Sequence, residues 1–478
     1  MAKMLIGGEL AESNSGQWIE VRNPATGEVV DRVPKGTVED VHRAVAAAEK
    51  ALPAWSALPT ARRGEILHKA VELVRQHEDE LAKLLTQEQG KPLGESVREL
   101  RRYAHTLEHY AGLAKTLRGG HVPRLDEHAY GLILKKPIGI CGAIVPWNFP
   151  VALLGNKLGP ALVAGNAVIV KPANTTPHTH IRVVELLCRA GVTPGALSVV
   201  TGAGATVGEE ILRHPRIRKI GFTGATVTGK HVMEVAAREI KRVTLELGGS
   251  DPMIVAEDAD LDAAVSAAAV GRFYNCGQAC LAIKRLYLFE RIYDAFVQKL
   301  VEKTKKLKVG NGLEKDARLG PLHTAAQREE VEEQVADAVK RGAKVLAGGK
   351  RPEGAEYAKG FFYLPTLVEN VPDDARIAQE ECFGPALPVF KVKDWDEALA
   401  RANNSVYGLG SSVWSRDLNA ALGAAERLES GYTWINSAQI IYDELPFGGV
   451  KWSVLGKEHG SEALDYYLET KSVVVGGG

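Results

Sequence analysis

The 478-residue sequence has little cysteine, no excess of charge of either sign and no long uninterrupted apolar run. Its five cysteines are an odd number scattered from Cys141 to Cys382, which excludes a disulfide framework and favours a reducing compartment. Lysine and arginine number 59, as do aspartate and glutamate, so no overall field attracts nucleic acid or an anionic membrane. At 45% hydrophobic and 25% charged residues, the chain matches a soluble globular protein of several domains.

Signals for export and membrane insertion are also scarce. Met1–Leu10 lacks the apolar stretch of a secretory signal. The most apolar segment, Ile138–Lys171, is interrupted by Pro146, Pro150 and Pro160, which would break a membrane-spanning helix. It predicts buried strands and a buried helix instead. We therefore expect a cytoplasmic protein that binds neither nucleic acid nor membranes.

The pattern of apolar residues indicates the fold class. Residues 37–40 form a capping box that predicts a helix through Ala51, and residues 61–116 continue with helical periodicity. From residue 138 the pattern changes, and strand-like and helix-like segments alternate, which is typical of βαβ units around a parallel sheet. The predicted strands cover 138–145, 167–170, 197–200, 217–222 and 285–289, and the predicted helices lie near 151–164, 177–190, 205–213, 226–238, 259–271 and 292–306.

The segment Phe273–Cys280 is the strongest candidate for a catalytic site. Its two cysteines, Cys276 and Cys280, could be metal ligands, a redox pair or buried core residues. No CxxC pair or nearby histidine completes a zinc ligand set, so we predict no metal site. Cys280 follows a glycine and two other residues that include a glutamine, a poor setting for packing alone. It is a candidate nucleophile, with core packing as the alternative.

A nucleophilic thiol needs a base and hydrogen-bond donors for an oxyanion. Glu246 ends an apolar strand and is flanked by two leucines, so burial should raise its pKa toward that of a base working near neutrality. A helix cap or an arginine partner is the alternative role. Asn148, in Pro146–Pro150, lies just past the strand at 138–145, where its amide could stabilise an oxyanion. An ordinary turn residue is the alternative there.

Two glycine-rich turns are candidates for binding a phosphate. The chain lacks GxGxxG, and Gly202–Gly208 reads GxGxxxG, one residue too long. Gly221–Gly229 follows a strand and opens a helix, so its backbone N–H groups could bind a pyrophosphate. Lys171, which ends the strand at 167–170, could add a positive charge or a hydrogen bond.

These segments together, in this order, resemble the aldehyde dehydrogenase superfamily. The resemblance extends over nearly the whole chain. The motifs that carry it are Pro146–Pro150, Lys171-Pro172, Gly221–Gly224, Leu245–Gly249, Phe273–Cys280, Glu381–Pro385 and Pro446–Gly449.

The resemblance implies an α/β fold with a Rossmann-like cofactor domain, an α/β catalytic domain and a small β oligomerisation element. The cofactor domain would span residues 1–245, interrupted by an oligomerisation hairpin at 118–137. The catalytic domain would span 246–445. A return segment and a C-terminal oligomerisation strand would occupy 446–478. The chain would form a homodimer or a homotetramer, and its small-molecule partner would be an aldehyde.

The resemblance also implies the catalytic roles. Cys280 would attack the aldehyde, and the Asn148 amide with the Cys280 backbone N–H would hold the oxyanion. Hydride transfer to NAD or NADP would leave a thioester, which water activated by Glu246 would hydrolyse to the carboxylic acid.

The same comparison implies a cofactor site. Lys171 would bind the adenine ribose, Gly224 and Ala225 the pyrophosphate, and Glu381 the nicotinamide ribose, with Phe383 beside it. The full predicted set is Ile144, Pro146, Trp147, Lys171, Ala173, Asn174, Gly204, Gly208, Phe222, Thr223, Gly224, Ala225, Leu247, Glu381 and Phe383.

Four departures from the family pattern matter. Asn174 replaces a glutamate that many NAD-preferring members carry, which suggests that NADP is accepted. Ala225 replaces a usual serine and removes one hydroxyl contact. Val454 replaces a common glycine and would be strained if its φ were positive. Cys276, at a variable position, could form a reversible disulfide with Cys280 that switches activity off.

The predicted substrate tunnel is largely apolar and is lined by Phe149, Leu153, Asn156, Tyr274, Leu281, Ile441 and Tyr442. Asn156 stands where members that oxidise anionic semialdehydes often have an arginine, so we expect neutral aliphatic or aromatic aldehydes. Two alternatives are a relative that transfers the acyl group to coenzyme A and a non-catalytic binding protein on the same scaffold. Glu246 argues against the first, and the joint presence of Cys280, Glu246 and Asn148 argues against the second.

Overall fold

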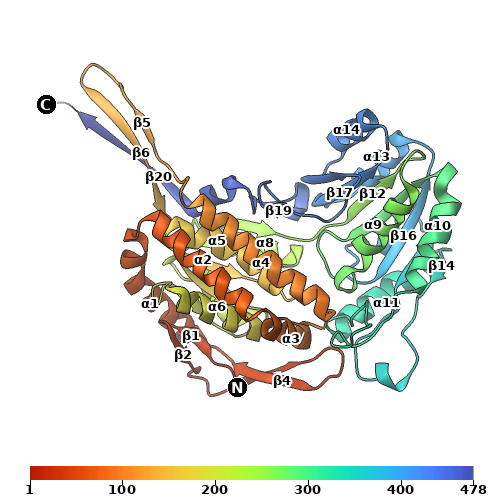
Figure 1. Ribbon diagram of the computed structural model, residues 1–478, viewed down its shortest axis with the longest axis horizontal. Helices are drawn as coiled ribbons and strands as arrows, with labels where there is room; N and C mark the ends of the chain where they lie inside the picture. Colours follow the sequence, from red (N-terminus) through yellow and green to blue (C-terminus); the bar gives the residue numbers. More distant parts are fainter. Residues whose placement is uncertain (477–478) are drawn as a thin grey trace.

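A computed structural model describes residues 1–476 and contains two large sheets and two small ones (Figure 1). The first large sheet has the order β19-β11-β10-β7-β8-β9-β1-β2. Its five central strands, β7 to β11, are parallel. β19 joins β11 antiparallel, β1 joins β9 antiparallel, and β2 joins β1 antiparallel. The strands are β1 (Met4–Ile6), β2 (Glu9–Ala11), β7 (Ile140–Ile144), β8 (Ala167–Lys171), β9 (Leu197–Val199), β10 (Ile217–Thr223), β11 (Arg242–Glu246) and β19 (Val454–Leu455).

Helices cover both faces of this sheet because successive residues of each strand point to opposite faces. Ile140 and Ile169 pack in the core beneath α1, α7 and α8, whereas Cys141 and Val168 pack in the core beneath α2 to α6. The helices are α1 (Val38–Ala57), α2 (Thr60–Gln76), α3 (Glu78–Gln89), α4 (Leu93–Leu113), α5 (Pro150–Ala164), α6 (Pro177–Ala190), a π-helix (Gly204–Gly208), α7 (Glu209–Arg213) and α8 (Thr226–Arg238).

The predicted alternation of strands and helices between residues 138 and 238 is confirmed. The capping box at Thr37 and Asp40 is also present, but α1 runs to Ala57 rather than Ala51. Pro53 lies inside the helix, and the fully buried Trp55 follows it. Burial of this indole offsets the backbone hydrogen bond that proline removes, so the helix continues past the proline.

The second large sheet has the order β14-β15-β16-β13-β12-β17-β18, with all neighbours parallel except β14 and β15. Its strands are β12 (Asp251–Val255), β13 (Ile283–Phe289), β14 (Lys344–Ala347), β15 (Thr366–Glu369), β16 (Ala386–Val392), β17 (Gly410–Trp414) and β18 (Tyr432–Ile435). The helices around it are α9 (Leu261–Phe273), α10 (Glu290–Lys305), α11 (Ala325–Lys340), α12 (Arg376–Gln379), α13 (Trp395–Asn403) and α14 (Leu418–Arg427), with 3-10 turns at Tyr274–Gly277 and Ala355–Tyr357. Two further 3-10 turns belong to the first sheet: Lys451–Ser453 leads into β19, and Ser461–Tyr467 packs against α5.

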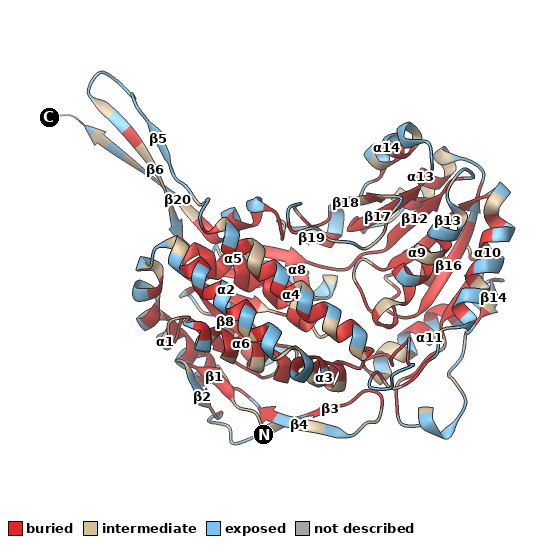
Figure 2. Cartoon of the chain, in the orientation of Figure 1, coloured by how far each residue is buried: buried red, intermediate tan, exposed pale blue. Residues whose placement is uncertain are grey.

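A three-stranded arm projects from the body, with β20 running toward its tip (Figure 1). It consists of β5 (Gly120–Val122), β6 (Ala129–Pro137) and β20 (Leu468–Gly476) in the order β20-β6-β5. Val474 at its end is 68% exposed, and most of the arm is exposed or intermediate (Figure 2). The last two glycines of the predicted C-terminal strand lie outside the described residues. A two-stranded sheet pairs β3 (Trp18–Arg22) with β4 (Val29–Pro34) around a turn at Asn23–Gly27.

The change from the first sheet to the second occurs between Glu246, the last residue of β11, and Asp251, the first of β12. After the second sheet, the C-terminal part of the chain returns to the first: β19 joins the first large sheet, and β20 then joins the arm. The functional division into cofactor, catalytic and oligomerisation parts stays a prediction. No helix within residues 1–476 is both long and apolar enough to cross a bilayer.

Candidate active site

The candidate site begins where the strand order of the first sheet reverses. From β7 the chain moves through β8 and β9 on one side, and then crosses back to place β10 on the other side of β7. Ligands of open parallel sheets bind outside the carboxyl ends of the strands at such a reversal. Trp147 and Asn148 follow β7 there, and Gly224 follows β10.

Cys280 lies in the loop between the 3-10 turn Tyr274–Gly277 and β13. Three residues just before it, Asn275, Cys276 and Gly277, all have left-handed backbones with φ of 50°, 56° and 72°. Such a run is costly for residues other than glycine and persists only where surrounding contacts hold it. It forms a sharp turn that leads into the cysteine.

Two buried cations hold this loop through its backbone carbonyls. Arg272 donates to the carbonyl of Gly277 in this loop at 3.4 Å, and to the carbonyls of Cys382, at 2.9 Å, and Gly384 in the segment beside it. Lys284 Nζ donates to the carbonyls of Ala279, at 2.9 Å, and of Cys280. Burial raises the pKa of the Cys280 thiol to about 12, although the nearby Lys284 lowers it. The thiol is therefore protonated at neutral pH, and its proton needs an acceptor during attack.

Asn148 is buried, and hydrogen bonds hold both its backbone carbonyl and its side-chain amide. Lys91 Nζ donates to its backbone carbonyl at 2.7 Å, and Asn275 Nδ2 donates to the same atom at 2.8 Å. The side-chain Nδ2 of Asn148 donates to the carbonyl of Gln278, two residues before Cys280, at 3.1 Å. A carboxamide has two N–H donors, so one remains for an oxyanion next to the thiol.

Glu246 is buried at the end of β11 in a cluster of charged groups. Burial raises the pKa of Glu246 well above its ordinary value, and the carboxylate of Glu458 raises it further. Glu458 is paired with Lys157 at 2.8 Å, and Lys157 Nζ also donates to Thr223 Oγ1 at 2.6 Å. Among the hydrogen bonds of residues 1–476, none reaches Glu246 Oε2, although this atom is buried. Such an unpaired acceptor suits a group that binds a proton during a reaction.

Glu246 does not hydrogen-bond to Cys280, and it is not among the residues that line the two cavities around the thiol. Its negative charge nevertheless raises the pKa of Cys280, so the two groups are near neighbours. Proton transfer between them needs a water molecule or a rotation of the glutamate side chain.

Two cavities meet at Cys280. One has a volume of about 450 Å³ and lies over the carboxyl ends of β7 and β10. The other has a volume of about 200 Å³ and lies between α4, α5 and the segment 439–459. Cys280 and Leu153 are the two residues that line both. A thiol at this point can reach molecules that enter from either side.

The larger cavity contains much of the predicted cofactor site: Pro146, Trp147, Thr223, Gly224, Ala225, Leu247, Glu381 and Phe383. α8 begins after Ala225, and no side chain caps its N-terminus. Its free N–H groups thus suit a pyrophosphate. Glu381 accepts from the Gly249 N–H at 3.1 Å and from Lys284 Nζ at 3.0 Å. Gly248 allows this, since a Cβ there would lie 2.4 Å from Glu381 Oε2.

The other predicted cofactor residues lie outside this cavity but at the same edge of the sheet. They are Ile144, Lys171, Ala173, Asn174, Gly204, Gly208 and Phe222. Gly208 packs against the Lys171 side chain, because a Cβ there would lie 3.5 Å from Lys171 Cδ. Burial lowers the pKa of Lys171 to about 8. Asn174 Oδ1 is buried without a hydrogen-bond partner among the described residues, as expected for an atom that a ribose hydroxyl would satisfy. These residues fit a dinucleotide.

The smaller cavity contains the predicted tunnel residues except Tyr442, namely Phe149, Leu153, Asn156, Tyr274, Leu281 and Ile441. Tyr442 is 52% exposed and does not line this cavity, so its predicted place in the tunnel stays a prediction. The rings of Phe149 and Tyr274 are nearly parallel, 5.8 Å apart. The sequence prediction missed the polar part of the wall, which Arg98, Arg102, Gln439 and His459 provide.

The structure bears on two of the departures from the family pattern, at Val454 and at Cys276. Val454 has φ of −157° and ψ of 153° in β19, which is an extended backbone that any residue adopts. The expected strain at this position is therefore absent. Cys276 is buried and, like Cys280, has a free thiol. Burial raises the pKa of Cys276, which disfavours the thiolate needed for disulfide exchange. The proposed redox role of Cys276 stays a prediction.

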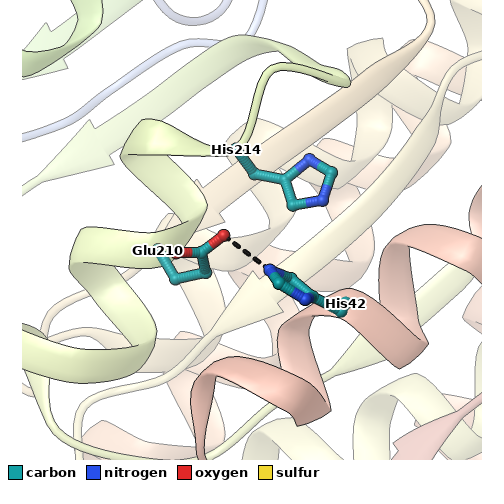
Figure 3. Close-up of side chains that lie close together, drawn as sticks. All are labelled: His42, Glu210 and His214. Atoms are coloured by element: carbon teal, nitrogen blue, oxygen red, sulfur yellow. Dashed lines mark hydrogen bonds and ion pairs between the residues drawn. The ribbon is translucent and has the colours of Figure 1, made fainter.

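One group of side chains with metal-binding atoms lies away from Cys280, where His42 of α1 meets Glu210 and His214 at α7 (Figure 3). His42 Nε2 bonds to Glu210 Oε1 at 2.9 Å. The Arg216 N–H donates to His214 Nδ1 at 3.2 Å, which places the ring proton of neutral His214 on Nε2. A metal ion bound to Nε2 would displace this proton to Nδ1. Nδ1 could then no longer accept from the Arg216 N–H, and that hydrogen bond would be lost. The contacts fit a surface ion pair beside an edge-on imidazole.

The sequence pattern of the aldehyde dehydrogenase family matches residues 10–473. The chain is 44% identical to the glutarate-semialdehyde dehydrogenase of Pseudomonas putida over 470 residues, which cover 98% of this chain and 97% of that protein. It is 42% identical to the NADP(+) succinate-semialdehyde dehydrogenase of Escherichia coli, with 99% and 97% covered.

Solved structures show the same similarity. An NADP-dependent enzyme of E. coli superposes with a TM-score of 0.97 at 41% identity, covering 99% of this chain and 98% of that one. A betaine aldehyde dehydrogenase of Staphylococcus aureus, solved with NAD+, also gives 0.97 at 35% identity, with 99% and 94% covered.

Proposed function

The chain belongs to the aldehyde dehydrogenase family, and we propose that it oxidises neutral aliphatic or aromatic aldehydes to carboxylic acids through a thioester on Cys280 that water hydrolyses. It is an NAD(P)-dependent oxidoreductase by membership of this family. The individual residue roles, the aldehyde class and the fate of the thioester are the parts that we propose.

The observation that carries this proposal is the position of Cys280 where the two cavities meet. An aldehyde in the smaller cavity and a nicotinamide in the larger one would approach the same sulfur from opposite sides. Holding the reactants around one atom converts a multi-component encounter into a local step.

The first step forms a carbon–sulfur bond between Cys280 Sγ and the carbonyl carbon. The carbonyl π electrons move to oxygen, where the free N–H of the Asn148 amide and the Cys280 backbone N–H stabilise the charge. The thiol proton goes through water to Glu246, whose raised pKa makes it a competent acceptor. Lys91 keeps the Asn148 backbone in place during this step.

The second stage needs an oxidant. When bound, the nicotinamide supplies the two-electron acceptor for the hydride that leaves the former carbonyl carbon. Gly224 and Ala225 would hold its pyrophosphate, and Glu381 its ribose. The acyl group then remains on Cys280 as a thioester. Glu246 first releases the thiol proton to solvent and so becomes a base again. It then removes a proton from a water molecule, the resulting hydroxide forms a C–O bond, and the C–S bond breaks to release the acid and the thiolate.

Asn174 supports use of NADP as well as NAD. A glutamate at this position would repel a 2′-phosphate, whereas an amide carries no charge. Asn174 Oδ1 is buried without a partner among the described residues, so it can accept from a ribose hydroxyl. If NADP supports less than a tenth of the efficiency of NAD, this part of the proposal is wrong.

The arm formed by β5, β6 and β20 supports a homodimer or a homotetramer. Its strand edges and exposed apolar residues, which include Val474 and Leu125, are of the kind that a second subunit covers. The measurement is the molar mass in solution of the whole chain and of a variant that ends before β20.

The deciding experiment measures reduced nicotinamide for a panel of aldehydes with NAD and with NADP, with and without coenzyme A, and repeats it for Cys280→Ala. We expect the free acid as product without coenzyme A. Production of an acyl-coenzyme A and no free acid would favour acyl transfer instead. No turnover of any aldehyde, or full activity of the variant, would contradict the mechanism.

A further inference from the structure

His459 is a buried polar residue of the tunnel wall that the proposed reaction does not use. Most of the residues that line the tunnel are apolar, but His459 also lines it and is only 1% exposed. Its backbone is left-handed, with φ of 56°, a conformation that residues other than glycine, asparagine and aspartate seldom adopt. The inference below rests on the proposed function, because it concerns the aldehydes that this tunnel accepts.

His459 is held from behind by Asp443, which is completely buried. Asp443 accepts hydrogen bonds from His459 Nδ1 at 2.7 Å, from Arg102 at 2.6 Å and from Thr106 at 3.1 Å, and His105 Nδ1 also bonds to it. Although burial acts in the opposite direction, the His459 hydrogen bond and the Arg102 charge hold the pKa of Asp443 well below its usual value. The carboxylate is ionised at neutral pH.

These contacts fix the tautomer of His459. An ionised carboxylate only accepts hydrogen bonds, so Nδ1 carries the proton. In the neutral ring, Nε2 then has a free lone pair. Among the hydrogen bonds of residues 1–476, none involves Nε2 of His459. With a neutral His459, the tunnel wall therefore contains an unpaired hydrogen-bond acceptor.

Arg102 also lines the tunnel, and its side chain is 29% exposed. It contributes N–H donors beside the His459 acceptor. A hydroxyl group is at once a donor and an acceptor, so it satisfies both neighbours. A neutral His459 offers a carboxylate no proton, so a carboxylate could bind only through the arginines of the wall, Arg98 and Arg102.

The volume of the tunnel limits the size of the molecule. An apolar cavity of about 150 Å³ binds benzene in another protein. The tunnel measures about 200 Å³, and the stacked rings of Phe149 and Tyr274 form part of its wall. We propose that His459, oriented by Asp443, makes the enzyme selective for hydroxylated aldehydes about the size of one substituted aromatic ring, whose hydroxyl donates to Nε2 and accepts from Arg102.

The test compares kcat/KM for benzaldehyde and for the three positional isomers each of hydroxybenzaldehyde, methoxybenzaldehyde and carboxybenzaldehyde. Methoxy compounds keep the oxygen but lack the donated proton. For at least one isomer we expect the hydroxyl compound to exceed its methoxy counterpart about tenfold, the usual effect of one buried hydrogen bond. Equal values for every pair, or a preference for the carboxylate, would overturn the proposal.

Two variants locate the effect. His459→Asn keeps a side chain that tolerates a left-handed backbone but is too short to replace Nε2, so the hydroxyl preference should fall to within about twofold. The loss of kcat/KM should be larger for the hydroxyl compound than for benzaldehyde. His105→Asn is the matched control, because His105 also bonds to Asp443 but is 58% exposed and does not line the tunnel. This variant should keep the preference. An unchanged preference in His459→Asn would disprove the role, and an equal loss for all aldehydes would mean that His459 serves the chemistry instead.

Binding to Cys280→Ala separates this proposal from the proposed function. Calorimetry with hydroxybenzaldehyde and methoxybenzaldehyde does not depend on turnover. About tenfold tighter binding of the hydroxyl compound, lost in Cys280→Ala with His459→Asn, supports the recognition site even if no aldehyde is oxidised. Equal binding of the two compounds counts against it even if both are oxidised.

Discussion

Glu458 and His459 are neighbours in the sequence, but their side chains enter two different polar clusters. Glu458 joins Lys157 and Glu246 at the end of β11, which we call the hydrolytic cluster. His459 joins Asp443 and Arg102 in the tunnel wall, which we call the recognition cluster. His459 and the next residue, Gly460, have left-handed backbones, so the chain turns sharply just after Glu458.

The two clusters differ in which atom they leave unpaired. The hydrolytic cluster lies outside the walls of both cavities, and its unpaired atom is Glu246 Oε2, which can bind a proton. The recognition cluster opens on the tunnel, and its unpaired atom is His459 Nε2. The first should affect the oxidation of every aldehyde, whereas the second should affect only aldehydes that carry a hydroxyl group. Variants of each cluster can test this separation.

The largest effect is expected for Cys280→Ala, because every aldehyde reacts at the Cys280 sulfur whichever cluster it depends on. Replacing Cys280 with alanine removes the nucleophile, so kcat/KM should fall by roughly 10⁴-fold or more for all aldehydes. Nicotinamide reduction measures this loss, and a retained melting temperature controls for folding. If hydroxylated aldehydes alone kept activity, the two clusters would not share a single reaction centre.

The next largest effect is expected for Glu246→Gln, which keeps the size of the side chain but removes the base. kcat should fall by about 10²- to 10⁴-fold, because Glu246 both accepts the thiol proton and activates the water that hydrolyses the thioester. In the wild type kcat should rise with pH, because burial raises the pKa of Glu246 and only its ionised form acts as a base. The pH dependence of kcat should lose this acid limb in the variant. If Glu246→Gln also altered the preference for hydroxylated aldehydes, the hydrolytic and recognition clusters would not act independently.

A smaller effect, about tenfold, is expected at the cofactor side. Asn174→Glu should lower the efficiency with NADP by about tenfold through repulsion of the 2′-phosphate and leave that with NAD nearly unchanged. The aldehyde profile measured with NAD should be the same as for the wild type. A shift in that profile would show that the cofactor cavity and the tunnel are not independent.

Glu458→Gln should shift a pH profile more than it lowers activity. The Glu458 carboxylate raises the pKa of Glu246, and Lys157 lowers it. Without this carboxylate Lys157 has no counter-ion, so the pKa of Glu246 falls and the acid limb of kcat moves to lower pH. The pH profile of kcat between pH 5 and 9 measures this, with His105→Asn as a control that leaves the limb in place. A shift to higher pH would contradict the assignment.

The smallest effect is expected for Tyr442→Ala. This side chain is half exposed and does not line the tunnel, so kcat/KM for benzaldehyde and its hydroxyl derivatives should stay within about twofold. A larger change would show that Tyr442 closes over the tunnel when an aldehyde binds.

The parts of the site that the sequence predicts are those with a local signature. Cys280 follows a glycine in a polar turn, Glu246 ends an apolar strand, and Asn148 lies past the end of another. Local patterns also predict the strands and helices between residues 138 and 238. Each of these features depends on neighbours within a few residues.

The missed residues work through contacts between distant segments. Lys157 and Glu458 are 301 positions apart, and Arg102 and Asp443 are 341 apart. In the sequence Lys157 is the only charge in an apolar helix, and Asp443 is one of several polar residues in a loop. The lone lysine could have been recognised as a residue that needs a buried partner, but nothing local identifies Glu458 as that partner. The extended backbone at Val454 likewise follows from its pairing with β11.

The pairing of β19 with β11 has a consequence for the order in which the molecule is made. A ribosome synthesises Cys280, Asn148 and Glu246 well before β19, Asp443 and Glu458. Until those later segments emerge, the edge of β11 is unpaired and Lys157 has no counter-ion. A nascent chain thus carries its nucleophile before the groups that control it, and activity should switch on only after the chain has returned to its first sheet.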